Sequence, residues 1–297
     1  MAAVLSVQPR RWAVNAPWLL VLAGFAAMAI PSYWTAAGGV WQTDENAHGP
    51  IVLAVVLWAC WQCRREVLAA PVLPMPVLGW PLFFAGLVLY CLARIFSISS
   101  VEFVSQLILI VGGALLLRGP AALRAAWFPL LYMLFLVPLP ASFVDAVTAP
   151  LKQWISVIVV DLLHVTGYPV ARAGVTISIG AYQLLVADAC SGLNSMAGLS
   201  AIGALFMFVM GRKGWLHNTI MALAILPIAF GANIVRVASL VLVTYHFGDE
   251  AGQGFLHGAA GLMLFLVAFA MLILLDLGVA ALLRSSRPPV RNPGPVA

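Results

Sequence analysis

LHNTIMALAILPIAFGANIVRVASLVLVTYH, residues 216–246, is the stretch on which the fold depends, because Arg236 is its only Lys, Arg, Asp or Glu. A membrane-spanning helix needs about 20 mostly apolar residues, and this stretch is considerably longer. Phe230-Gly231-Ala232-Asn233 lies near its middle and has the composition of a helix break. The stretch therefore predicts either one broken or tilted crossing of a membrane, or two short crossings.

Composition extends this interpretation to the whole chain. Of the 297 residues, 63% are hydrophobic and 8% are charged, and the mean hydropathy is +1.04. No soluble domain can cover so much apolar surface, and helices satisfy their backbone hydrogen bonds in lipid. We expect an all-α polytopic membrane protein with one multi-span domain over residues 1–283 and a basic cytoplasmic tail over residues 284–297.

Apolar runs predict about eight transmembrane helices, and basic residues give their orientation. With the N-terminus inside and residues 216–246 crossing once, cytoplasmic segments hold eleven of the fifteen Lys and Arg residues. Two crossings would instead place the three arginines of the tail outside, so we expect one. The basic residues are scattered between spans, which argues against nucleic acid as a partner. The predicted spans lie near residues 17–35, 50–63, 77–96, 102–118, 126–141, 191–210, 216–246 and 257–281.

Residues 141–189 are the longest stretch that does not span cleanly, and this topology places them on the non-cytoplasmic side. Apolar side chains recur near helical spacing over residues 144–165, which predicts a helix lying on the membrane surface. Alternation on both sides of Gly180-Ala181 predicts a short β-hairpin. The hairpin would lead directly to Cys190.

Cys190 is the first candidate catalytic residue. It begins the sixth predicted span within Asp188-Ala-Cys-Ser191-Gly-Leu-Asn194, at the outer surface and at a helix N-terminus. The helix dipole and free backbone N–H groups favour a thiolate and an adjacent oxyanion there. We expect Cys190 to be a nucleophile with Asp188, Ser191 and Asn194 in supporting positions; a small residue packing a helix start is the alternative.

Arg236 and Asn233 form a second group of candidates. Arg236 lies about ten residues from the outer end of its span, or roughly 15 Å along a regular helix. Ionisable residues inside a span are costly and are functional-site candidates by default. Asn233 precedes Arg236 by three residues and therefore shares its helix face. A structural pairing of Arg236 with Asp188 is compatible with a catalytic role.

Histidine is the third component, and His257 is the preferred candidate for the general acid and base. It opens the last predicted span beside Gly258-Ala-Ala-Gly261, where small residues allow another helix to approach closely. His246 lies between two aromatic residues and is typical of an aromatic belt. His48, in Asn46-Ala-His-Gly-Pro50, is also on the outer face. Both a supporting role in the site and a role at a helix start stay open for it.

A thiol, an imidazole and a guanidinium on one side of a membrane suit acyl transfer. The thiolate attacks a peptide carbonyl, the imidazolium protonates the leaving amine, and the arginine stabilises the oxyanion. The product is a thioester. Water as its acceptor would make the enzyme a protease, and an amine would make it a transpeptidase.

At these residues the chain resembles the exosortase/archaeosortase family of multi-span membrane proteins. The resemblance covers nearly the whole chain and implies that Cys190 is the nucleophile of a triad completed by Arg236 and His257. It rests on Ala189-Cys190-Ser191-Gly192-Leu193, on Asn233-Ile-Val-Arg236, on His257 with Gly261, and on Ala47-His48-Gly49.

The resemblance also implies the substrates and the location. The substrates would be exported proteins whose carboxy-terminal sorting signal has a Pro-Glu-Pro-like motif, a transmembrane helix and a basic end, in bacteria that make extracellular polysaccharide. The site would lie near the periplasmic face of the inner membrane, with both termini in the cytoplasm. Membrane lipid is the other expected partner, and no cofactor is expected.

The main alternative is a transporter or a polysaccharide-assembly membrane protein. Arg236 and Asp188 would then belong to a substrate path along a broken helix, but this reading gives Cys190 no role. A metalloprotease is disfavoured because the chain has no His-Glu-x-x-His motif. Cys60-x-x-Cys63 lies in an apolar run without a second ligand pair, so we expect no metal site.

Overall fold

A computed structural model describes residues 11–43, 46–185, 193–212, 214–257 and 259–285. Four of the described helices are long and apolar enough to cross a membrane, and they coincide with four of the predicted spans. This confirms an all-α polytopic membrane protein, while the number eight stays a prediction. The four are α3 (Pro76–Ile95), α4 (Ser99–Leu117), α10 (Trp215–Phe247) and residues Ala259–Leu283 of α12 (Ala259–Ser285).

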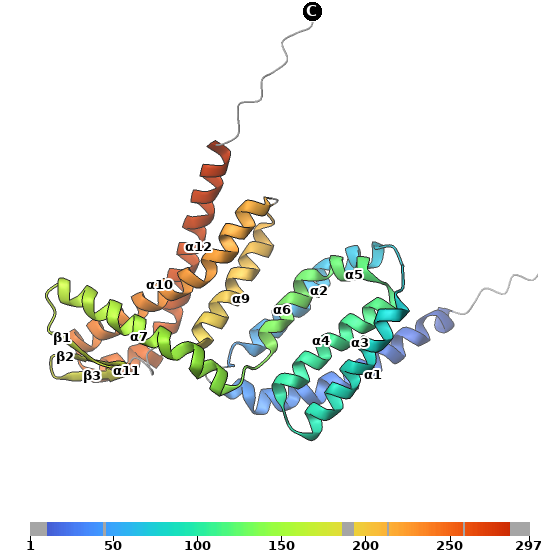
Figure 1. The fold of residues 1–297 in the computed structure, drawn as a ribbon, viewed down its shortest axis with the longest axis horizontal. Helices are drawn as coiled ribbons and strands as arrows, with labels where there is room; N and C mark the ends of the chain where they lie inside the picture. Colours follow the sequence, from blue (N-terminus) through green and yellow to red (C-terminus); the bar gives the residue numbers. More distant parts are fainter. Residues whose placement is uncertain (1–10, 44–45, 186–192, 213, 258, 286–297) are drawn as a thin grey trace, which may run out of the picture. The chain divides into compact units, whose positions relative to one another are not determined.

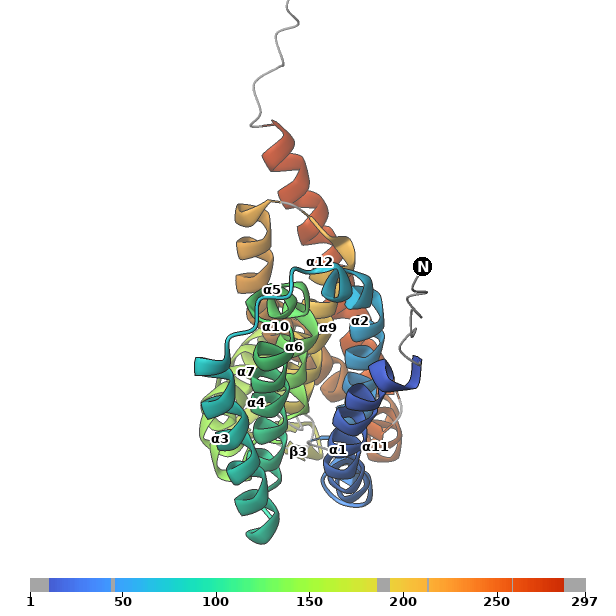
Figure 2. The same ribbon diagram turned by 90° about the vertical axis from the view of Figure 1, so that its right-hand side faces the viewer.

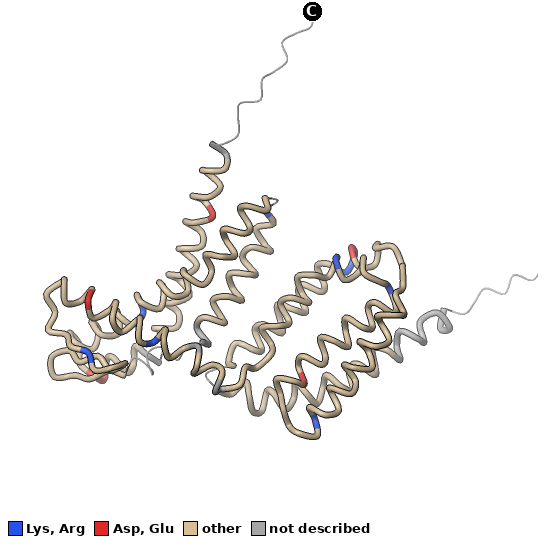
Figure 3. The backbone as a smooth tube through the Cα atoms, in the orientation of Figure 1, with Lys and Arg blue, Asp and Glu red and all other residues tan. Residues whose placement is uncertain are grey.

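The other four predicted spans are also largely helical where they are described, although residues 137–140 of the span near 126–141 are not helical. Figure 3 shows that Lys, Arg, Asp and Glu are sparse along the helices. The four spans correspond to α1 (Arg11–Gly38), α2 (Gly49–Ala69), α6 (Trp127–Tyr132) with the following 3-10 turn η2 (Met133–Leu136), and α9 (Leu193–Met210).

Internal contacts divide the chain into two compact units, residues 1–138 and 139–297. The expectation of one membrane domain over residues 1–283, with a separate tail over residues 284–297, stays a prediction.

Unit 1 contains α1 to α6, with η1 (Val40–Gln42) and α5 (Pro120–Ala125) as short connecting turns. Its tightest packing joins α3 and α4, which lie side by side in both views (Figures 1 and 2). A Cβ at Gly86 would lie 2.8 Å from Leu109, and one at Gly112 would lie 2.7 Å from the backbone of Phe83. Small residues thus let the two helices approach closely, as is common for helices in lipid.

Unit 2 begins with α7 (Ala141–Val165) and a three-stranded antiparallel sheet in the order β1-β2-β3. The strands are β1 (Val170–Ala173), β2 (Thr176–Ile179) and β3 (Tyr182–Leu185). The predicted hairpin is confirmed as β2–β3, because Ile179 pairs with Tyr182 across Gly180-Ala181. Gly180 has a φ of +57°, which such a tight turn favours. The pairing of β1 with β2 was not predicted.

A hydrophobic cluster fixes the sheet to α7 and α10. Ile177 and Ile179 of β2 are fully buried, because alternate residues of a strand point to the same face. The strand that precedes the Cys190 segment is thereby paired with a strand that is anchored in the core of unit 2. The cluster also contains Ile155, Val159 and Leu163 of α7 and Val237, Leu240 and Val241 of α10.

The longest helix, α10, is continuous over 33 residues. Of the two forms predicted for a single crossing, the one broken at Phe230–Asn233 is therefore wrong, and so is the alternative of two separate segments; a tilted crossing stays a prediction. At 1.5 Å per residue the helix is about 50 Å long, whereas the hydrocarbon core of a bilayer is about 30 Å thick. A single crossing by α10 must therefore tilt or extend beyond the hydrocarbon.

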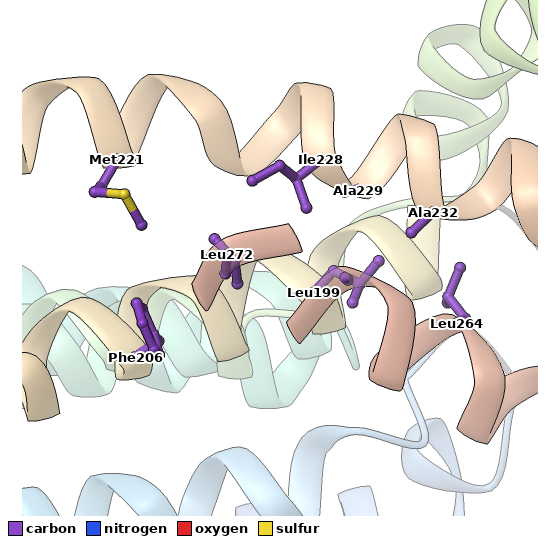
Figure 4. Packing of buried hydrophobic residues seen from close by; sticks show 9 residues of the cluster. Leu199, Phe206, Met221, Ile228, Ala229, Ala232, Leu264 and Leu272 are labelled. Carbon is purple, nitrogen blue, oxygen red and sulfur yellow. The ribbon is translucent and has the colours of Figure 1, made fainter. Parts of the chain in front are cut away.

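The three helices α9, α10 and α12 share a second hydrophobic cluster (Figure 4). Along α10 the labelled residues run from Met221 to Ala232, while α9 runs from Leu199 to Phe206 and α12 from Leu264 to Leu272 in the opposite direction. Both neighbours are therefore antiparallel to α10. The cluster holds Leu199, Phe206, Met221, Ile228, Ala229, Ala232, Leu264, Ala268 and Leu272.

A short amphipathic helix, α11 (Asp249–His257), separates α10 from α12 and was not predicted. His257 was expected to open the last span. It is instead the last residue of α11, and α12 begins at Ala259. The position of the histidine is thus set by a helix that packs on α10.

Candidate active site

The predicted site residues of unit 2 come from three parts of the chain. Cys190, Asp188 and Ser191 lie outside the described residues. For Asn194, in the first turn of α9, and for His257, at the end of α11, the structure describes the backbone position.

Arg236 and Asn233 lie on the buried side of α10, close to Ala232, which packs against α9 and α12. Arg236 is 6% exposed and Asn233 is 2% exposed. Both are within one turn of Ala232, which is fully buried in the cluster shared by α9, α10 and α12. The polar face predicted from their spacing of three residues therefore points into the helix bundle.

The cluster also gives the level of Arg236 along the bundle. Ala232 shares the cluster with Leu199, six residues after the start of α9, and with Leu264, five residues after the start of α12. These separations correspond to about 9 Å and about 7.5 Å along the two helices. Arg236 lies one turn beyond Ala232, toward the ends at which its antiparallel neighbours begin. It is therefore near the level where α9 and α12 start.

Asn233 has an unusual environment. Its Oδ1 atom is fully buried and has no hydrogen-bond partner among the described residues. Leaving a buried acceptor unsatisfied costs about 1–3 kcal/mol. In a native protein such an atom needs an explanation, and a site that receives a ligand is one of them.

The family comparison covers most of the chain. Residues 40–274 match the family described as Transmembrane exosortase (Exosortase_EpsH). The chain belongs to the transmembrane exosortase family. No curated protein and no solved structure gave a match. Membership implies a multi-pass membrane protein-sorting enzyme that acts on exported proteins with carboxy-terminal sorting signals, and the matched range includes Cys190, Arg236 and His257.

A second polar cluster of this exosortase lies toward the other end of α10 and was not predicted. The carboxylate of Asp276 in α12 accepts two hydrogen bonds from one edge of the Arg212 guanidinium, from Nε and Nη2, and its Oδ1 lies 2.8 Å from Nε2 of His217. Asp276 and His217 are buried. The hydrogen bond to Asp276 raises the pKa of Arg212. Asp276, an ionisable residue inside an apolar run, was the signal that could have revealed this cluster.

These three residues fasten the start of α10 to α12. Asn218 adds a hydrogen bond from its Nδ2 to the carbonyl of Arg212, 2.9 Å long, which closes the loop between α9 and α10. Each charge of the cluster has a partner, so its geometry suits a structural role.

His48 belongs to unit 1 of the exosortase, at the N-cap position of α2. Its side chain makes no capping hydrogen bond, so a side-chain cap is not its role. Burial lowers the pKa of His48, and a hydrogen bond to the backbone of Phe135 partly offsets this shift. Its supporting role beside residues of unit 2 stays a prediction.

Three of the four cysteines lie in described helices of unit 1. Cys60, Cys63 and Cys91 are free thiols, and Cys63 Sγ donates to the carbonyl of Cys60 at 3.5 Å. In the described ranges, no group of three or more His, Cys, Asp or Glu side chains could hold a metal ion.

Proposed function

We propose that this exosortase is a cysteine protease or transpeptidase in which Cys190, His257 and Arg236 cleave the sorting signals of exported proteins. The proposal rests mainly on the buried Arg236. This residue lies near the level where α9 and α12 begin, and these helices directly follow Cys190 and His257 in the sequence. The side-chain carbonyl of Asn233, one turn away, has no hydrogen-bond partner in the part of the chain that the structure describes, and this supports a ligand site at the same level.

The reaction begins with the thiolate of Cys190, which attacks a peptide carbonyl carbon of the substrate. Arg236 stabilises the negative charge that develops on the carbonyl oxygen, an effect typically worth about 10²–10³ in rate. The imidazolium of His257 gives its proton to the leaving amine as the C–N bond breaks. The remaining thioester is resolved by water or by an amine, whose proton passes to His257.

The Asn233 amide would orient the substrate backbone beside Arg236. Asp188, Ser191, Asn194 and His48 would support the site, with Asp188 as the carboxylate partner for Arg236. A buried guanidinium held by one carboxylate keeps further N–H donors for the oxyanion.

The substrates would be exported proteins whose tail has a Pro-Glu-Pro-like motif, a transmembrane helix and a basic end. Anchoring the substrate in the same bilayer would hold its scissile bond near the site. The site would lie at the periplasmic face of the bacterial inner membrane, with both termini in the cytoplasm. The chain would thereby act in the sorting of proteins exported beside extracellular polysaccharide.

The continuous α10 argues against the transporter alternative. Transporter sites of this kind use discontinuous helices, whose ends bind the substrate near the middle of the bilayer. Here Arg236 and Asn233 lie within an unbroken helix, so that mechanism loses its structural basis.

The proposed function predicts that Cys190→Ala abolishes processing of a co-expressed substrate while the protein still accumulates in the membrane. Cys91→Ala is the matched control, because this cysteine is a free thiol that is exposed in α3, and the double change of Cys60 and Cys63 to Ala should also retain activity. Processing is measured by immunoblotting and by mass spectrometry of the new carboxyl end, which separates hydrolysis from transfer. Undiminished cleavage by Cys190→Ala would exclude the thiol mechanism.

A further inference from the structure

The helices α10 and α11 approach each other closely at Thr244 and Gly252. A Cβ atom at Gly252 would lie closer than 3.0 Å to Thr244 Oγ1 and 3.2 Å from Thr244 Cβ. Real Cβ atoms essentially never come so near to another heavy atom. Both residues are fully buried, so an added methyl group has no free space beside the contact.

The neighbouring backbone fixes this contact in place. Gly248 ends α10 with a φ of +89°, its N–H donates to the carbonyl of Thr244 at 2.9 Å, and its own carbonyl accepts the N–H of Gly252 at 3.1 Å. Phe255 packs against the hydrophobic cluster that holds the sheet. The reversal from α10 into α11 is therefore held at Gly248, at Gly252 and at Phe255.

Thr244 has no hydrogen-bond partner for its Oγ1 among the described residues, although this atom is fully buried. The Cα atom of Gly252, which carries no side chain, lies beside this oxygen. Thr244 also lies two turns after Arg236 on nearly the same face of α10. The contact thus connects the helix that carries the arginine to the helix that ends at His257.

We propose that Gly252 is a positioning residue whose missing side chain sets the separation of α10 and α11, and with it the place of His257 relative to Arg236. This inference rests on the proposed function. His257 is five residues after Gly252, about 7.5 Å along α11. Moving the two helices apart at Gly252 therefore displaces the histidine by a similar amount.

The expected effect follows from the sensitivity of acyl transfer to geometry. A misplacement of about 1 Å can reduce a rate by about 10²-fold. We expect Gly252→Ala to lower kcat by about 10–100-fold while KM for the substrate changes less than about threefold. Substrate binding is spared because the change moves the acid and base and not the surface that holds the substrate.

Gly254→Ala is the matched control, because it adds the same methyl group to the same helix. A Cβ at Gly254 meets nothing within 4 Å. Both changes raise helix propensity by a similar amount. A difference between the two variants therefore does not come from helix propensity. Thermal unfolding of the purified proteins in detergent shows whether each variant is folded, and rates are calculated per folded molecule.

The decisive test is rescue from the opposite side of the contact. Thr244→Ala removes the oxygen that the new methyl group would meet, so Gly252→Ala with Thr244→Ala should recover most of the lost kcat. An unchanged kcat for folded Gly252→Ala, or a double variant as slow as the single one, would overturn the proposal. If Gly252→Ala does not accumulate, Thr244→Val, which places a larger group against an unchanged Gly252, must lower kcat, and a wild-type value overturns the proposal.

Failure of this inference is distinct from failure of the proposed function. Cys190→Ala is assayed in parallel with the same substrate. Processing that persists in Cys190→Ala removes the proposed function itself. Loss of processing in Cys190→Ala, together with wild-type kinetics in Gly252→Ala, removes the positioning role alone.

Discussion

The two polar regions of α10 differ in how their buried atoms are satisfied. Near its start, Asp276 of α12 is bound by Arg212 and His217, and each charge has a partner. In the second half of the helix, Asn233 and, about three turns further along, Thr244 bury oxygen atoms without partners among the described residues. Charges that pair with one another hold helices together. A buried acceptor without a hydrogen-bond partner is instead typical of a site that receives a ligand, or of a place where close packing offsets the cost of the missing bond.

The comparison shows why an ionisable residue inside a span does not by itself mark an active site. Asp276 and Arg236 are both buried within helices of unit 2. Asp276 accepts hydrogen bonds from Arg212 and lies 2.8 Å from Nε2 of His217, so its negative charge is already compensated by neighbouring side chains. Arg236 shares its face with an unsatisfied amide and lies near the level where two neighbouring helices begin. The neighbours of each charged residue, and not how deeply it is buried, distinguish the structural role of Asp276 from the catalytic role proposed for Arg236.

The largest effect expected from this comparison is on the rate. Arg236→Gln should reduce processing by about 10²–10³-fold, because the oxyanion loses a charged donor. Arg212→Gln is the matched control at the other end of α10, and its rate per folded molecule should stay within about threefold of the wild type. Initial rates on a purified substrate in detergent or nanodiscs measure both. Equal losses in the two variants would remove the distinction between the two regions.

The next effect is on stability. Asp276→Asn breaks the buried pair with Arg212 and weakens the contact with His217. We expect it to lower the free energy of unfolding by about 3 kcal/mol. This value is near the lower end of the range of losses for breaking a buried ion pair, because Arg212 is 30% exposed. For a unit of this size the loss corresponds to a decrease of about 6–12 °C in Tm.

Thermal unfolding in detergent, followed by circular dichroism or tryptophan fluorescence, measures this change. Asp161→Asn is the control, because Asp161 is exposed on α7 and the same substitution should leave Tm nearly unchanged. The rate per folded molecule should remain close to wild type in both variants. A loss of activity in folded Asp276→Asn would instead connect this cluster to the chemistry.

Much of the fold could be predicted from residue patterns, because lipid leaves few choices. Long apolar runs must be helical in a bilayer, so the four clear spans lay where the hydropathy placed them. The hairpin was also predictable, since alternation and Gly180 act over a few residues. Local composition was misleading at Phe230–Asn233, where packing against α9 and α12 keeps α10 helical through residues that alone are typical of a break.

The candidate site was less predictable, because it depends on contacts between distant segments. The spacing of Asn233 and Arg236 showed that they share a face, but only the packing of Ala232 with Leu199 and Leu264 shows where that face points. The helix α11 escaped prediction because its nine residues are too few for a clear periodic signal. The Asp276 cluster joins residues about 60 positions apart, which no local pattern reveals.

The smallest effect concerns two histidines: His217 lies beside the carboxylate of Asp276, whereas His48 has no carboxylate partner among the described residues. Burial lowers the pKa of His48 below its unfolded value near 6.5, so the unfolded chain binds its proton more readily than the folded protein does. Stability from this residue is complete above about pH 6.5 and is lost as the pH falls toward the folded pKa. The Tm of the wild type should therefore fall slightly more between pH 7.5 and pH 5 than that of His48→Gln. Because His48 is only half-buried, solvent screening keeps the difference small, and parallel curves for the two proteins would show that His48 does not contribute to acid sensitivity.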